Sequence, residues 1–246
     1  MAIGASGKKS ADNAIKLLCQ NATKESCYTV VADPSENGRL FYSPSLDGVN
    51  FKKVGAPLAD TLTQMMALES VENPHAVSIQ AASISAALPA LVASHKLDQL
   101  NDSIEPTLWA SNRSRVAAHY DLSDNIACVA VGTRRFTLFP PEQVANLYVG
   151  PTMNSPGGVP TSLVDLQNPD FETYPNFKQA LAAATTATLT PGDAIFIPSP
   201  WWHAVDSLDD INVLINFWWS EHIKPNQPTA GTVSYTHLTL PTTPYV

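Results

Sequence analysis

The run Arg115-Val-Ala-Ala-His-Tyr-Asp121 constrains this chain more than any other, because it reads as a β-strand that carries two metal-binding side chains. Alternate side chains of an extended strand lie on one face, so His119 and Asp121 offer an imidazole and a carboxylate to the same point. Far downstream, His203 follows a Pro-Gly-Asp turn and a short apolar segment. A β-barrel would bring His203 across to the other two residues.

These three residues predict a metal centre. Two histidines and one carboxylate on one face of a metal leave the opposite positions open, an arrangement typical of non-haem iron(II) oxygenases. A bare His-x-Asp triplet is common by chance, so the surrounding sequence decides whether it indicates a metal site. We predict that His119, Asp121 and His203 bind iron(II) and form the catalytic centre.

The surrounding sequence is mostly β-structure. Strands are expected near residues 39–43, 76–80, 108–111, 116–121, 126–131, 134–139, 187–190, 194–198 and 211–219, and helices at residues 11–20 and from Pro57 onward. Short strands at close spacing, separated by turn residues, are typical of a sandwich or barrel. The prediction is a mainly β fold with flanking helices, in a strand order that fits a jelly roll or double-stranded β-helix.

Two further segments flank the candidate ligands, Arg134-Arg-Phe-Thr-Leu-Phe-Pro-Pro141 and Thr190-Pro-Gly-Asp-Ala-Ile-Phe-Ile-Pro198. Together with His119-Tyr-Asp121 and Trp201-Trp-His203 they resemble the cupin-like branch of the JmjC-related oxygenases. That branch includes asparaginyl hydroxylases of the factor-inhibiting-hypoxia-inducible-factor type. The resemblance covers residues 38–220 and implies a cupin/JmjC-like jelly-roll barrel with iron(II) and 2-oxoglutarate-dependent dioxygenase activity.

A 2-oxoglutarate oxygenase needs a cation for the distal carboxylate of its co-substrate, and Arg134 is the best candidate. Phe136 and Leu138 define the inward face of their strand, which Arg134 shares and Arg135 does not. The similar proteins have a lysine at the position aligned with Arg134. The alternative is that Arg134 pairs with a buried Asp or Glu.

Asn125 and Asn216 match polar residues that line the co-substrate pocket of the resembling hydroxylases, although each could equally be a core amide. Two family features are missing. Val116 stands where the family has a hydroxyl, and the family's tyrosine from an earlier strand is not found at residues 76–81.

Three functional interpretations follow. The first is an iron(II) and 2-oxoglutarate-dependent hydroxylase that acts on a protein side chain or a small molecule. The second is a cupin metalloenzyme that does not use 2-oxoglutarate. The third is a non-catalytic barrel that serves as a binding module.

The expected domain organisation has three parts. Residues 1–33 form an N-terminal helical segment, expected to be truncated, and residues 34–222 form the cupin-like/JmjC oxygenase domain. Residues 223–246 are rich in Thr and Pro and have no amphipathic pattern, which predicts a disordered or foreign tail in which His237 is no ligand. A homodimer is compatible with such a chain if a C-terminal region is restored.

The composition of the chain limits the kinds of partner that it is expected to bind. The chain has 246 residues, a formal net charge of −8 and a pI near 5.1, which argue against nucleic-acid or anionic-membrane surfaces. The sequence lacks a signal-peptide pattern and a long apolar run, so a cytoplasmic protein is expected. Three cysteines without close pairing predict neither a disulfide framework nor a zinc site.

Overall fold

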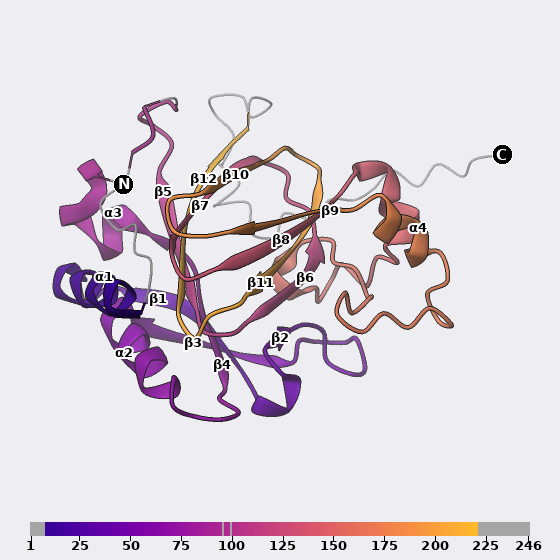
Figure 1. The fold of residues 1–246 in the computed structure, drawn as a ribbon, viewed down its shortest axis with the longest axis horizontal. Helices are drawn as coiled ribbons and strands as arrows, with labels where there is room; N and C mark the ends of the chain where they lie inside the picture. The colour runs from indigo at the N-terminus through magenta and orange to yellow at the C-terminus, as the bar shows by residue number, and fades with distance from the viewer. Residues whose placement is uncertain (1–7, 95, 99, 221–246) are drawn as a thin grey trace.

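The computed structural model describes residues 8–94, 96–98 and 100–220. Two β-sheets face each other in a double-stranded β-helix of the cupin type, with helices packed on the outside (Figure 1). The predicted mainly β fold with flanking helices is therefore confirmed. The tail expected at residues 223–246, including His237, lies outside the described residues.

The larger sheet has seven strands in the order β10-β7-β12-β5-β4-β1-β3. Its strands are β1 (Ser26–Ala32), β3 (Phe51–Pro57), β4 (Ala76–Ser83), β5 (Pro106–Ser111), β7 (Asp124–Val131), β10 (Ala194–Ile197) and β12 (Asn212–Trp219). All neighbouring strands in it run antiparallel.

The smaller sheet has five strands in the order β2-β6-β11-β8-β9. Its strands are β2 (Arg39–Leu40), β6 (Arg115–His119), β8 (Arg134–Phe139), β9 (Thr185–Leu189) and β11 (Trp202–Ser207). Only the short β2–β6 pair is parallel among the described strands of this sheet.

Helices cover the outer face of the seven-stranded sheet (Figure 1). They are α1 (Lys8–Asn21), α2 (Leu58–Leu68), α3 (Ile84–Ala87) and the 3-10 segment η2 (Pro89–Ser94). Apolar side chains such as Leu18, Leu62 and Met65 pack with Ile79 and Ile215 of the sheet in one buried cluster. The amphipathic pattern of α1 and α2 is thus explained by burial against the sheet.

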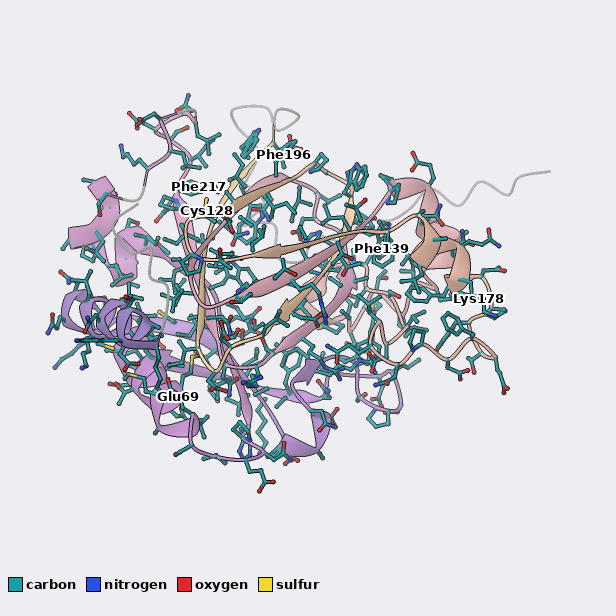
Figure 2. The ribbon with its side chains drawn as sticks, in the orientation of Figure 1. Glu69, Cys128, Phe139, Lys178, Phe196 and Phe217 are labelled. Carbon is teal, nitrogen blue, oxygen red and sulfur yellow. The ribbon has the colours of Figure 1, made fainter. Side chains whose placement is uncertain are left out.

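The outer face of the five-stranded sheet is covered by the segment between β8 and β9. This segment contains the 3-10 turns η3 (Pro141–Asn146) and η4 (Pro156–Gly158) and the helix α4 (Phe177–Ala182). A further 3-10 turn, η1 (Pro34–Glu36), precedes β2. Phe177 of α4 packs with Phe139 and Trp202 of the sheet, and Figure 2 shows Phe139 on the side of α4. The long segment of residues 150–176 between η3 and α4 is part of this cover.

A third cluster fills the space between the two sheets. Phe136, Leu138 and Val205 of the smaller sheet meet Val129 and Leu214 of the larger one. Side chains in phase with these residues point into the barrel, because successive side chains of a strand alternate between its two faces.

The structure corrects three details of the prediction. Residues 1–33 were expected to be helical, but Ser26–Ala32 form β1, which pairs with β3 and β4 inside the seven-stranded sheet. Strands β3 and β11 were not predicted. Strand β6 ends at His119, so Asp121 lies in the following turn instead of within the strand.

Among the helices of the described ranges, none has both the length and the apolar composition required to cross a bilayer.

The packing of α2 on the sheet can be tested by truncating Leu62, which is fully buried. Leu62→Ala should lower the free energy of unfolding by about 2–5 kcal/mol, because it removes buried methyl groups and leaves a cavity. Leu181→Ala is the matched control, since Leu181 is 41% exposed. Urea unfolding of both variants measures the difference. Equal losses would show that α2 does not pack as described.

Candidate metal centre

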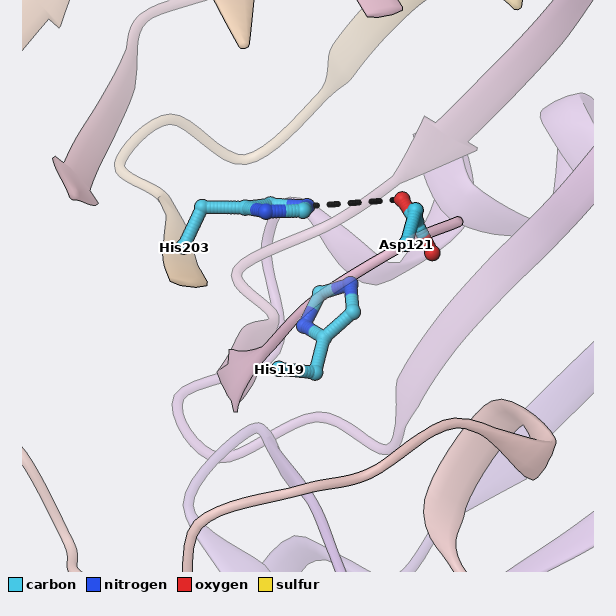
Figure 3. Close-up of side chains that lie close together, drawn as sticks. All are labelled: His119, Asp121 and His203. Carbon is cyan, nitrogen blue, oxygen red and sulfur yellow. Dashed lines mark ion pairs between the residues drawn. The ribbon is translucent and has the colours of Figure 1, made fainter. Parts of the chain in front are cut away.

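The structure brings the three predicted ligands together, as Figure 3 shows. His119 is the last residue of β6, and it pairs with His203 near the start of the neighbouring strand β11. Asp121 reaches the same point from the turn between β6 and β7. One ligand atom from each of the three residues lies within 4.8 Å of the others. This spacing suits three donors around one metal ion.

The hydrogen bonds of the two imidazoles prepare them as metal ligands. Nδ1 of His119 lies 2.9 Å from the carbonyl oxygen of Ala117, and Nδ1 of His203 lies 3.2 Å from that of Trp201. A carbonyl oxygen only accepts hydrogen bonds, so each Nδ1 carries the hydrogen and each Nε2 keeps its lone pair. Nε2 of His203 lies 3.6 Å from a carboxylate oxygen of Asp121.

Burial also keeps His203 in the neutral form that binds metals. Its side chain is almost fully enclosed, and burial lowers its pKa to about 4, with a smaller contribution from His119 in the same direction. The carboxylate of Asp121 acts in the opposite direction and does not reverse the shift. His203 is therefore unprotonated at neutral pH, as metal coordination requires.

The ligands open onto a cavity of about 200 Å³ between the two sheets. Arg134, Asn125 and Asn216, the three predicted co-substrate residues, all line this same cavity. Arg134 is 6% exposed, whereas Arg135 points to the other face of β8 and forms an ion pair of 2.7 Å with Asp206. The inward direction predicted for Arg134 is confirmed.

Arg134 is a buried cation that forms no ion pair with the residues that the structure describes. Burial lowers its pKa to about 10, so it stays protonated at neutral pH. Its Nε atom has no hydrogen-bond partner, and within the described part of the chain no carboxylate forms an ion pair with it. The alternative of a buried Asp or Glu partner is therefore wrong for these residues. A buried unpaired charge is costly, so the cavity is suited to an anionic ligand.

Asn125 and Asn216 face each other across β7 and β12. The side-chain nitrogen of Asn216 donates to the side-chain oxygen of Asn125 at 2.8 Å. The side-chain oxygen of Asn216 has no partner within the described part of the chain. The two amides thus support each other at the cavity wall and leave one buried acceptor unsatisfied. Such an acceptor is unusual in a folded protein, and a bound ligand would explain it.

Several cavity residues were not predicted from the sequence. Tyr28 comes from β1, Gln80 from β4 and Trp109 from β5. The tyrosine sought at residues 76–81 is absent there, and Tyr28 enters the cavity from the adjacent strand. Because β1 was not predicted, the sequence held no signal that would place Tyr28 here.

The long loop after η3 contributes the remaining wall. Pro156, Gly157 and Val159 line the cavity, and Thr161 forms a β-bridge with the ligand residue His119. Gly157 has a φ of +72°, a left-handed conformation that favours glycine. The loop is thus anchored at the candidate metal centre, as expected for a functional loop.

The family to which the chain belongs is consistent with this barrel and its candidate metal ligands. The family described as "Cupin-like domain" matches residues 4–225, so the chain belongs to the cupin-like domain family. The resemblance to the JmjC-related branch is confirmed by the similar proteins.

Three relatives illustrate the range of this family. "Lysine-specific demethylase JMJ31" of Arabidopsis thaliana is 37% identical over 118 residues, which are 48% of this chain and 21% of the relative. Human "HSPB1-associated protein 1" is 36% identical over 116 residues, 46% of this chain and 23% of the relative. Chicken "tRNA wybutosine-synthesizing protein 5" is 37% identical over 101 residues, 41% of this chain and 29% of the relative. The matches thus span less than a third of these relatives.

The metal assignment predicts a strong effect of removing one ligand. His203→Ala should weaken iron(II) binding about 100-fold or more, because one of the three protein donors is lost. His75→Ala is the matched control, since His75 is exposed and outside the cluster. Calorimetric titration with iron(II) under anaerobic conditions measures both affinities. Unchanged binding by His203→Ala would show that the metal binds elsewhere.

Proposed function

We propose that this chain is an iron(II) and 2-oxoglutarate-dependent dioxygenase that hydroxylates a protein side chain or a small molecule. The observation that carries the proposal is the position of Arg134, a buried cation that no described carboxylate pairs, in the same cavity as His119, Asp121 and His203. A metal centre alone needs no such cation. A co-substrate with one end at the metal and an anionic group at the other end needs both.

The register of β8 and β11 gives the spacing between the two ends of the cavity. Leu138 lies opposite His203, and Arg134 lies opposite Ser207. Four residues of strand separate the two positions, which corresponds to roughly 13 Å between Cα atoms. The arginine and histidine side chains shorten this gap, so a five-carbon dicarboxylate fits between them.

Each cavity residue has a defined part in this proposal. His119, Asp121 and His203 would hold iron(II), which supplies the activation of dioxygen when it is bound. Arg134 would bind the distal carboxylate of 2-oxoglutarate with its planar fork of N–H donors. The buried side-chain oxygen of Asn216 remains available as an acceptor at the wall.

The apolar side chains between these groups support the same reading. Phe136, Val205 and Leu214 line the cavity beside Arg134 and are buried. They exclude water from the path between the metal centre and the guanidinium. Electrostatic attraction between Arg134 and a carboxylate is stronger in such surroundings than in water.

The relatives support oxygenase chemistry of the family and leave the substrate open. Their names include a lysine-specific demethylase and a tRNA wybutosine-synthesizing protein, so substrates differ within the family. A tRNA substrate suits this chain poorly because its net charge is −8.

One observation favours a second candidate, a cupin metalloenzyme that does not use 2-oxoglutarate. Val116 lines the cavity at the position where the resembling hydroxylases have a hydroxyl. A 2-oxo acid bound beside Arg134 would lack that hydrogen bond. The metal ligands are the same in both candidates, so only co-substrate use separates them.

The role of Arg134 predicts opposite effects on stability and on binding. Arg134→Met should abolish most of the rise in melting temperature that 2-oxoglutarate gives, with a loss in affinity of about 30-fold or more. The ligand-free variant should be no less stable than the parent, since an unpaired buried charge has been removed. Arg135→Met is the control on the same strand. A larger loss of affinity in Arg135→Met would contradict the assignment.

Turnover distinguishes the functional candidates. With iron(II), 2-oxoglutarate and dioxygen, the protein should form succinate, and a cell extract that supplies substrate should increase the rate. Asp121→Ala serves as the inactive control because it lacks a metal ligand. Iron-dependent turnover of a substrate without succinate would favour the second candidate. The absence of any turnover would favour a non-catalytic binding module.

A further inference from the structure

The mouth of the cavity contains a side-chain acceptor that the proposed co-substrate does not use. Gln80 lines the cavity from β4, next to Tyr28 of β1. Its side-chain nitrogen donates to the hydroxyl of Ser78 at 2.7 Å. That hydrogen bond fixes the orientation of the amide, so the carbonyl oxygen of Gln80 remains available for a group entering the cavity.

The other side chains around Gln80 are apolar or aromatic. Tyr28 is 45% exposed and Phe51, Trp109, Trp218 and Val159 are partly buried at the cavity wall. Trp109 and Trp218 pack edge to face, with ring centroids 5.6 Å apart and an interplanar angle of 83°. In this edge-to-face pair the edge of one ring points at the face of the other, so the two ring faces are not directed together at one cation.

The charged side chains in the cavity already have roles in the proposed function. Among the described lining residues, Asp121 is the sole carboxylate and Arg134 the sole guanidinium. Asp121 would bind the metal and Arg134 the co-substrate. Lys53 shares the face of Val30 across β1 and β3, but it is exposed to solvent and lies outside the lining. A charged substrate group would therefore enter without a counter-charge, which is unfavourable.

We propose that this cavity accepts an uncharged substrate group and holds it by a hydrogen bond to the side-chain carbonyl of Gln80. The inference rests on the proposed function, because it assigns the metal and Arg134 to the co-substrate. The substrate group is mainly apolar and carries an N–H or O–H donor, as an amide or an alcohol does. Tyr28, Trp109 and Val159 contact its apolar part.

The test uses three probes that differ only in their head group: butyramide, butylammonium and butyrate. They are titrated against the full chain loaded with zinc(II) and 2-oxoglutarate, in which turnover cannot occur. The fluorescence of Trp109 and Trp218 reports binding at the mouth. Butyramide should bind about tenfold or more tightly than either charged probe.

A second experiment changes the charge at the mouth of the cavity. Gln80→Glu places a carboxylate there without a large change of shape, and it should shift the preference from butyramide towards butylammonium by about tenfold or more. Gln64→Glu is the matched control, because Gln64 is exposed on α2 and changes the net charge equally. The control variant should keep the preference of the parent protein for butyramide over butylammonium.

The outcomes separate this inference from the proposed function. Binding of 2-oxoglutarate is measured first, and its absence would contradict the proposed function. In that case the head-group titrations are run on the protein loaded with zinc(II) alone. Equal binding of the probes, tighter binding of a charged probe, or no binding of any probe would overturn the inference. A butyramide preference that Gln80→Glu leaves unchanged would overturn the role of Gln80.

Discussion

The pairing of β6 with β11 is the constraint on which the site depends. It places His119 opposite His203, while β8 pairs with the other edge of β11 and sets Leu138 opposite the same histidine. A slip of one residue would turn His203 out of the barrel and separate it from its partners. Because β11 lies between two strands and is buried along its whole length, its register is held from both sides. The backbone carbonyls of Ala117 and Trp201 then orient the two imidazoles.

The barrel combines this candidate metal centre with a buried charge that no carboxylate of the described residues pairs. Arg134 is buried beside apolar side chains, and the amide oxygen of Asn216 likewise has no partner among the described residues. Each of these features reduces the stability of the ligand-free protein. A bound dicarboxylate would supply the counter-charge that Arg134 lacks, whereas the amide oxygen of Asn216 needs an N–H or O–H donor. Both unsatisfied groups line the cavity onto which the candidate metal ligands open.

Local patterns predicted the parts of the site that depend on one strand at a time. The alternation in Arg134–Phe139 gave the inward direction of Arg134, and the His119-Tyr-Asp121 spacing gave two ligands. Strand β3 was missed because it is a polar edge strand with exposed lysines, and β11 because burial on both faces removes any alternation. Tyr28 and Gln80 reach the cavity through the order of strands in the sheet, which no local pattern encodes.

The most direct test of the account is whether the metal and 2-oxoglutarate bind to one site. Calorimetry can measure the affinity for 2-oxoglutarate of the metal-free protein and of the protein loaded with manganese(II). If one ligand contacts both the metal and Arg134, the metal should strengthen 2-oxoglutarate binding by about tenfold or more. Equal affinities with and without metal would contradict the account, because the triad and Arg134 would then belong to separate sites.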